Sequence, residues 1–188
     1  MRLFIAINVD PALQAPLAAV QARLKTTAAP VSWVKPENLH FTLKFLGEVP
    51  EARLPALQEA FRSSIAGMGR FILSLVGLGT FPPRGRPRVV WVGVEQGVDE
   101  MRTLQGRIDE TLLPLGFARE TRPLQPHLTL GRVRDVGRLD ALLTVLQGTE
   151  IGQVGQMDVR CVDLMQSRLH QAGSVYTRVE SVPLSEEN

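Results

Sequence analysis

The chain has 188 residues, which fits one globular domain, and its 44% hydrophobic and 21% charged residues exclude a disordered or fibrous protein. The net charge is only +2, and no apolar run approaches the length that spans a bilayer, so a membrane partner is not expected. The single cysteine, Cys161, excludes an internal disulfide and favours a reducing compartment, the cytoplasm.

Hydrophobic periodicity predicts strands and helices in turn along the first half of the chain. Asp10 and Pro11 are typical of a helix start, with the carboxylate as N-cap and proline in the first turn. The predicted elements are a strand at 3–9, helices at 11–24 and 54–65, and strands at 38–45, 71–78 and 88–94. A loop rich in proline, glycine and arginine, residues 81–87, separates the last two strands.

The second half repeats this order less clearly. An apolar stripe from Val98 to Leu115 predicts a helix that ends at Gly116, a residue suited to a C-cap. The other predicted elements are a strand from 127, a short helix at 138–147, and strands at 157–165 and 174–180. Hairpins and short loops between strands favour an antiparallel α+β fold. We interpret the two halves as a distant duplication with a pseudo-twofold arrangement, within a single domain at 1–188.

One four-residue pattern occurs twice, as His-Phe-Thr-Leu at 40–43 and His-Leu-Thr-Leu at 127–130. In a strand, side chains two apart share a face, so each His projects with its Thr while the apolar neighbours point to a core. A single strand His is usually structural, but a repeated polar face must meet water, a ligand or a polar network. Facing strands would place two imidazoles and two hydroxyls around one cavity. The candidate site residues are His40, Thr42, His127 and Thr129.

These residue types favour acid–base chemistry on a phosphate, without a metal or cofactor. Neither motif contains a carboxylate, and the usual spacings of metal ligands are absent. A Gly-x-Ser-x-Gly turn for a serine nucleophile and a glycine-rich phosphate loop are absent as well. One imidazole would accept a proton from the attacking oxygen and the other would protonate the leaving oxygen. The hydroxyls, with Lys44 or Arg132, would hold the phosphoryl oxygens.

Flanking residues fit either a binding or a structural role. Strict alternation puts Arg132 on the core face, unless Gly131 permits a β-bulge that turns the side chain toward the phosphate. The arginines within residues 84–88 form either an RNA-binding edge or an ordinary loop. Trp33 and Phe81 are able to stack on bases, but we expect them to pack at the core or its rim.

The first motif lies in Glu-Asn-Leu-His-Phe-Thr-Leu-Lys-Phe-Leu-Gly at 37–47, and the second in Pro-His-Leu-Thr-Leu-Gly-Arg at 126–132. Both stretches resemble the 2H phosphoesterase superfamily, and within it the RNA 2′,3′-cyclic phosphodiesterase group, also called 2′-5′ RNA ligases. Residues 2–7, 32–40 and 89–94 are similar to the same group, so the resemblance covers nearly the whole chain.

The resemblance implies a bilobal α+β fold, a pseudo-twofold arrangement of antiparallel sheets flanked by helices, with a central cleft. It implies metal-independent hydrolysis of an RNA 2′,3′-cyclic phosphodiester end to a 2′-phosphate. His40 would be the proton donor to the 3′ oxygen and His127 the proton acceptor from water. The residues expected to bind the phosphate are Thr42, Thr129 and Arg132. The expected partner is RNA with a 2′,3′-cyclic phosphate end or a small nucleotide, and the chain is expected to be a monomer.

Two alternative functions stay open at this point. The same residues would serve an ATP-independent 2′-5′ RNA ligase that joins the cyclic phosphate of one tRNA half to the 5′-hydroxyl of the other. The Lys-x-Asp-Gly motif of an ATP-dependent ligase is absent. The other alternative is a non-catalytic RNA- or nucleotide-binding module, which loss of a His or Thr would indicate, whereas both pairs are intact.

Overall fold

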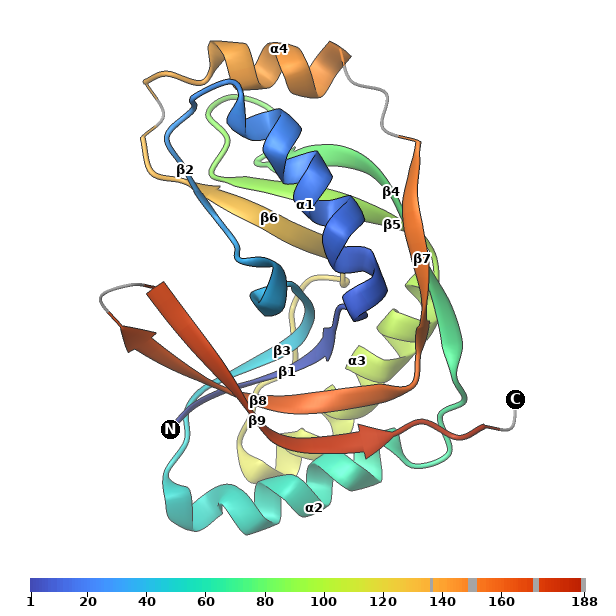
Figure 1. The fold of residues 1–188 in the computed structure, drawn as a ribbon. Coiled ribbons are helices and arrows are strands. Elements are labelled where there is room, and N and C mark those ends of the chain that lie inside the picture. The colour runs from blue at the N-terminus through green and yellow to red at the C-terminus, as the bar shows by residue number, and fades with distance from the viewer. Residues whose placement is uncertain (136, 149–151, 171–172, 187–188) are drawn as a thin grey trace.

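Two antiparallel sheets form the two lobes of the molecule, and each sheet contains one His-x-Thr strand (Figure 1). The computed structural model describes residues 1–135, 137–148, 152–170 and 173–186. The first sheet, in spatial order, consists of β3 (His40–Glu48), β1 (Arg2–Asn8), β8 (Cys161–His170) and β9 (Gly173–Pro183). The second consists of β2 (Val31–Trp33), β6 (His127–Val133), β5 (Val89–Gln96), β4 (Phe71–Phe81) and β7 (Gln153–Val159).

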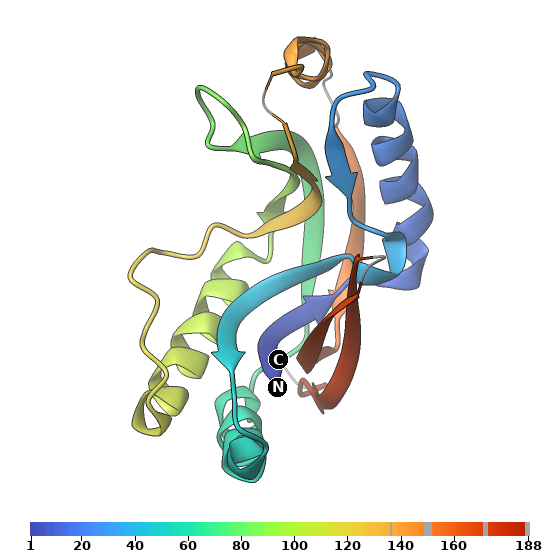
Figure 2. The ribbon, with the colours of Figure 1, turned by 90° about the vertical axis from the view of Figure 1, so that its left-hand side faces the viewer.

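Helices cover the outer faces of both sheets. They are α1 (Pro11–Lys25), α2 (Leu54–Ile65), α3 (Val98–Leu112) and α4 (Asp140–Gly148), with short 3-10 helices at Pro36–Asn38, Glu51–Arg53 and Leu113–Leu115. Helix α1 follows β1 but packs against the second sheet, so close to β7 that a Cβ on Gly155 would lie 2.5 Å from Leu13. Helix α3 follows β5 but packs against β3 of the first sheet, beside α2 (Figure 2).

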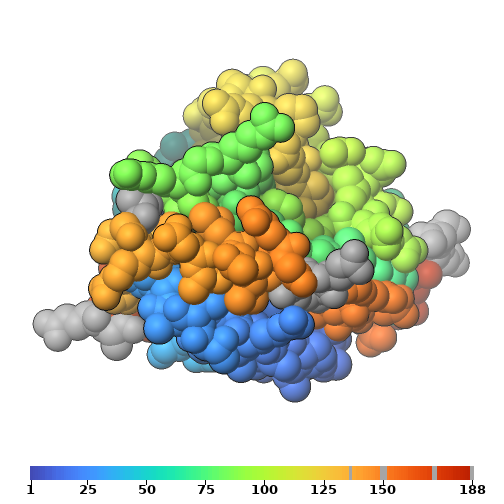
Figure 3. Space-filling model, turned by 90° about the horizontal axis from the view of Figure 1, so that it is seen from above, coloured from blue at the N-terminus to red at the C-terminus, as the bar shows by residue number. Residues whose placement is uncertain are grey.

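At the far end of the second lobe, α4 lies between α1 and the end of β4 with the loop that follows it (Figure 3). Each sheet therefore receives elements from both halves of the chain. The order β3-β1-β8-β9 in the first sheet corresponds to the order β6-β5-β4-β7 in the second. Each series begins with the strand that contains the His-x-Thr motif. The expected α+β fold, with antiparallel sheets flanked by helices in a pseudo-twofold arrangement, is confirmed. A lobe is not a sequence half, because the C-terminal hairpin β8–β9 pairs with β1.

Local sequence signals predicted most of these elements. The carboxylate of Asp10 caps α1 by accepting a hydrogen bond from the backbone N–H of Ala12 at 2.8 Å. Gly116 ends the 3-10 turn after α3 with φ of 82°, a left-handed conformation that glycine adopts without strain. The prediction of one strand at 157–165 was wrong, because the strand is interrupted at Arg160, where the chain passes from β7 in one sheet to β8 in the other.

Buried side chains from both sheets and from the helices that cover them form one continuous hydrophobic core. Strand β1 is buried on both faces, since five of its seven residues have almost no exposed surface. Burial on two faces holds β1 in register with β3, because a slip of one residue would exchange its faces. The core therefore fixes the position of the first motif strand. Among the described residues, no helix is long and apolar enough to cross a membrane.

Candidate active site

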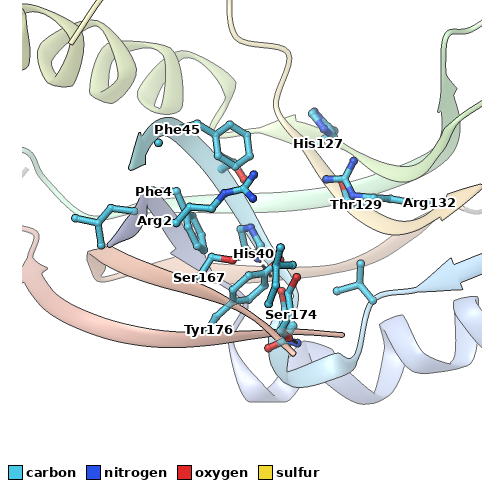
Figure 4. Close-up of a pocket in the computed structure, with 16 residues that line it drawn as sticks. Arg2, Phe4, His40, Phe45, His127, Thr129, Arg132, Ser167, Ser174 and Tyr176 are labelled. Atoms are coloured by element: carbon cyan, nitrogen blue, oxygen red, sulfur yellow. Dashed lines mark hydrogen bonds between the residues drawn. The ribbon is translucent and has the colours of Figure 1, made fainter. Parts of the chain in front are cut away.

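A pocket of about 520 Å³ lies where the two sheets meet, and both motif strands line it (Figure 4). Strand β3 contributes His40 and Thr42, and strand β6 contributes His127, Thr129 and Arg132. All five residues singled out in the sequence thus come together, although 87 positions separate the two histidines. The other lining residues are Arg2, Leu3, Phe4, Val34, Asn38, Phe45, Gly47, Ser167, Leu169, Ser174 and Tyr176.

Each imidazole is held in the same way by its own strand. Nδ1 of His40 lies 2.7 Å from the carbonyl oxygen of Asn38, and Nδ1 of His127 lies 2.7 Å from the carbonyl oxygen of Gln125. A carbonyl only accepts, so Nδ1 carries the hydrogen in both rings. In the neutral ring, Nε2 is then the nitrogen that is able to take a proton. Both histidines therefore present Nε2 for proton exchange with a ligand.

A β-bulge interrupts each motif strand at its leucine. In β3, Thr42 pairs with Ala6 and Lys44 with Ile5, which leaves Leu43 without an opposite residue. In β6, Leu130 is the unpaired residue, between positions that pair with Trp91 and Val90. A bulge inserts one residue and reverses the facing of the residues that follow it. In β3 the reversed stretch ends at a second bulge, at Leu46. Both motifs therefore change face at the same point.

The bulge in β6 turns Arg132 into the pocket, on the side of His127 and Thr129. The alternative raised from the sequence, a bulge beside Gly131, is thus the arrangement that the structure has. Gly131 suits this place, because a Cβ there would lie 2.5 Å from a methyl carbon of Val31 and 3.0 Å from the ring of Trp33. The neighbouring strand thus lies too close to Gly131 for a side chain.

The bulge in β3 overturns two expectations from strict alternation. Phe45, which alternation along the predicted strand at 38–45 places on the core face with Phe41, is 63% exposed and lines the pocket. Lys44, expected beside the phosphate, is buried and forms an ion pair with Asp109 of α3. Its ammonium group also donates to the carbonyl oxygen of Ala118 at 2.6 Å. Lys44 therefore ties β3 to the helix layer and does not line the pocket.

Two glutamines on helices hold the bulges from behind. The buried amide of Gln21 donates to the carbonyl oxygen of Leu130 at 2.9 Å, and the half-buried amide of Gln105 donates to the carbonyl oxygen of Leu43 at 3.3 Å. No pattern in the sequence pointed to either glutamine. Nothing in their helical spacing distinguishes them from other polar helix residues, because their partners lie 109 and 62 positions away.

Aromatic rings surround each histidine. The ring centroid of His40 lies 5.0 Å from that of Phe4 and 5.2 Å from that of Tyr176. The ring of His127 lies edge-on to Phe81 at 4.8 Å. Trp33 packs partly against the core near Gly131, as expected. These contacts fix the planes of both imidazoles and shield His40 from water.

The surroundings of His40 change its acidity. Burial lowers the pKa of His40, the hydrogen bond to the carbonyl of Asn38 raises it, and the positive charge of Arg132 lowers it, with a net lowering from the usual value. His40 therefore favours its neutral form more strongly than an exposed histidine does.

The described residues that line the pocket include two arginines, Arg2 and Arg132, and no carboxylate. This combination favours an anion. Within the described parts of the chain, no three side chains of His, Cys, Asp or Glu group closely enough to hold a metal ion.

Two antiparallel sheets that bring paired His-x-Thr strands to one anion-attracting pocket define the class of 2H phosphoesterases. A family profile described as LigT like Phosphoesterase matches the chain twice, at residues 7–91 and 92–176, so each match contains one motif. The chain belongs to the LigT-like phosphoesterase family.

Individual relatives and solved structures agree with this assignment. The chain is 38% identical over 180 residues to a protein of Methanothermobacter thermautotrophicus named RNA 2′,3′-cyclic phosphodiesterase, covering 96% of this chain and 97% of the relative. A protein of the same name from Archaeoglobus fulgidus is 38% identical and covers 94% and 96%. The protein TT0787 of Thermus thermophilus has a TM-score of 0.79, 28% identity and full coverage of both chains. E. coli LigT complexed with 3′-AMP has a TM-score of 0.78, 25% identity and 98% coverage of both chains.

Proposed function

We propose that this protein hydrolyses the 2′,3′-cyclic phosphodiester at an RNA end and leaves a 2′-phosphate and a free 3′-hydroxyl. One observation carries the proposal: both His-x-Thr strands line one pocket, and each imidazole is held through Nδ1 by the carbonyl two residues before it. Relatives named RNA 2′,3′-cyclic phosphodiesterase, at 38% identity, support this substrate class.

In the proposed reaction, Nε2 of His127 accepts a proton from water while the water oxygen bonds to phosphorus. The bond from phosphorus to the 3′ oxygen breaks, and His40 gives a proton to that oxygen. The hydroxyls of Thr42 and Thr129 and the guanidinium group of Arg132 hold the phosphoryl oxygens, where negative charge grows. One imidazole gains a proton and the other loses one, and exchange with solvent restores both.

The substrate itself prepares His40 for the role of donor. The pKa of His40 is lowered by burial and by the charge of Arg132. A phosphodiester carries a negative charge, which favours the protonated imidazole beside it. The charge of the bound phosphodiester therefore offsets that of Arg132 and favours a protonated His40 beside the leaving oxygen.

We propose that neither a metal ion nor a cofactor takes part, because the two imidazoles perform both proton transfers. The test is turnover of an oligonucleotide that ends in a 2′,3′-cyclic phosphate, in the presence of excess EDTA. We expect full activity. If chelation abolished turnover and a divalent ion restored it, the nucleophile would be a metal-bound water and not a water activated by His127.

Product analysis in the same assay separates the alternatives. A 2′-phosphate end supports the proposed hydrolysis, whereas a 3′-phosphate would mean that the 2′ oxygen leaves and that the substrate lies reversed. A second RNA with a 5′-hydroxyl tests ligation, since a joined 2′-5′ product without ATP would show the ligase reaction. Tight binding without turnover would instead show a nucleotide-binding module.

We also propose that the chain acts as a single domain at 1–188, as a monomer in the cytoplasm. The five residues proposed to act on the phosphate, two histidines, two threonines and Arg132, meet within one chain, so they need no second copy to form the site. A free thiol at Cys161 and an RNA substrate fit a reducing, cytoplasmic setting. Light scattering during gel filtration measures the oligomeric state, and a dimer would contradict this part of the proposal.

A further inference from the structure

A second hollow, of about 460 Å³, adjoins the candidate active site. Five residues line both spaces: Val34, Asn38, Arg132, Ser174 and Tyr176. Strand β2 and the end of β6 form one wall of this hollow, and the start of β9 forms the opposite wall. A hydrogen bond from the side chain of Asn38 to the carbonyl of Ser174, at 3.2 Å, connects the two walls.

The second hollow is positively charged. Lys35, Arg132 and Arg134 line it, and among the described lining residues there is no carboxylate. Ser32 holds Arg134 in place, because its hydroxyl accepts a hydrogen bond from Nε of that arginine. The backbone N–H of Arg134 donates to the carbonyl of Pro30 at 2.8 Å. Because Ser32 binds only Nε, the two terminal nitrogens of this guanidinium group are able to make the paired hydrogen bonds that a phosphate accepts.

We propose that the second hollow binds the phosphodiester and nucleoside immediately 5′ of the terminal nucleotide of an RNA. This inference rests on the proposed function, since it takes the cyclic phosphate to lie between the two histidines. The terminal ribose uses its 2′ and 3′ oxygens in the ring, so the chain continues only through the 5′ phosphate. That phosphate lies one nucleotide away from the cyclic one, and the adjoining hollow offers it Lys35 and Arg134.

The residues that line both spaces explain how one RNA strand would pass from the candidate active site into the second hollow. Arg132 lines both spaces, so it borders the proposed positions of both phosphates. Tyr176 also lines both, and its ring stands edge-on to His40, which gives the sugar and base at the boundary an aromatic surface. The preferred substrate is therefore the end of an RNA chain rather than a free cyclic mononucleotide.

The test compares two substrates, adenosine 2′,3′-cyclic phosphate and the dinucleotide ApA that ends in a 2′,3′-cyclic phosphate. We expect kcat/KM to be about tenfold higher for the dinucleotide, as one charge-assisted phosphate contact supplies. The double variant Lys35→Ala/Arg134→Ala should reduce this ratio to near one, mainly through KM. Replacement by Lys35→Arg/Arg134→Lys should keep most of the preference.

The chain offers a matched control for the loss of charge. Arg23 and Lys25 are exposed at the end of α1 and line neither space. The variant Arg23→Ala/Lys25→Ala also removes two positive charges. It should keep the ratio of kcat/KM between the two substrates that the unmodified protein has. Equal ratios in all three proteins, or a loss in the control as large as in Lys35→Ala/Arg134→Ala, would overturn the proposed subsite.

A binding measurement separates failure of this inference from failure of the proposed function. ApA with a 3′-phosphate is not a substrate, and its affinity relative to 3′-AMP depends only on the contacts that it makes. If no cyclic substrate is hydrolysed but the dinucleotide binds more tightly through Lys35 and Arg134, the reaction is wrong and the subsite holds. If hydrolysis occurs while both ligands bind equally, the subsite is wrong and the reaction holds.

Discussion

The side-chain amide of Gln21, on α1, lies 2.9 Å from the carbonyl oxygen of Leu130 and donates a hydrogen bond to it. Leu130 is the residue that the β6 bulge leaves unpaired, and the same amide donates to the carbonyl of Val34 at 2.8 Å. A carbonyl oxygen accepts up to two hydrogen bonds, and at Leu130 the backbone N–H of Val34 supplies one of them, at 2.8 Å. Gln21 supplies the other and links α1 to both chain segments beside Arg132.

Replacing Gln21 by methionine should therefore both destabilise the protein and disturb the site. The variant keeps the length of the side chain but removes the hydrogen bond to the carbonyl of Val34 and one of the two to that of Leu130, which costs about 1–3 kcal/mol of unfolding free energy. Urea unfolding measures this loss, and kcat/KM measures the effect on Arg132. Gln14→Met, on the same helix and half-buried, serves as the control. Unchanged stability in Gln21→Met would show that the bulge does not depend on the hydrogen bonds of Gln21.

Loss of either histidine should slow the reaction severely. We expect His40→Ala and His127→Ala each to reduce kcat by about 10²–10⁴, the usual range for a general acid or base. The double variant should lose much less than the product of the two effects, because both residues act in one step. Circular dichroism checks that each variant folds. Near-normal turnover in either folded single variant would remove that histidine from the reaction.

The two threonines should act on phosphate affinity rather than on folding. We expect Thr42→Ala and Thr129→Ala to weaken binding of inorganic phosphate and to slow turnover, with little change in melting temperature, since both side chains line the pocket. A crystal structure with phosphate or sulfate tests the contact directly. Hydroxyls that point away from the bound anion would contradict the proposed role.

Lys44 should matter for stability and not for phosphate. It is 3% exposed, and Asp109 is its partner. Removing one member of a buried ion pair leaves an unpaired charge, so Lys44→Met should cost about 3–5 kcal/mol of unfolding free energy. Lys44→Met/Asp109→Asn should recover part of that loss, because no buried charge remains. Loss of phosphate affinity in the folded single variant would restore Lys44 as a ligand.

The pKa of His40 should respond to charges in the pocket. Burial and the positive charge of Arg132 lower this pKa. Arg132→Ala removes one of these causes, so the pKa should rise, and bound inorganic phosphate should raise it as well. NMR titration of the imidazole measures both shifts, with Arg23→Ala as a control far from the pocket. A fall of the pKa in Arg132→Ala would contradict the assigned cause.

The same lowered pKa makes the folded protein less stable in acid. The unfolded chain binds a proton at His40 near pH 6.5, while the folded chain binds it only at lower pH. The stability contributed by neutral His40 is thus present above about pH 6.5, and it is lost as the pH falls through the folded pKa. Thermal unfolding at a series of pH values should show this loss, and His40→Gln should show less of it.

Local patterns in the sequence predicted most of the elements and five residues that line the pocket. Asp10 before Pro11 predicted the start of α1, and Gly116 predicted the end of the turn after α3. The repeated His-x-Thr pattern predicted that both histidines and both threonines would line one cavity, as they do. These signals depend on residues within a few positions of each other, as helix capping and strand alternation do. They are therefore readable without knowledge of the fold.

Only the tertiary structure decided which way the chain faces after each motif. The bulges at Leu43 and Leu130 send Lys44 to the core and Arg132 to the pocket, and alternation alone predicts neither. The predicted strand is likewise interrupted at Arg160, because the residues before it pair in one sheet and the residues after it pair in the other. In each case the deciding partners lie tens of positions away, such as Asp109 for Lys44 and Gln21 for Leu130. Long-range hydrogen bonds and burial stabilise these conformations, and the local spacing of residues does not predict them.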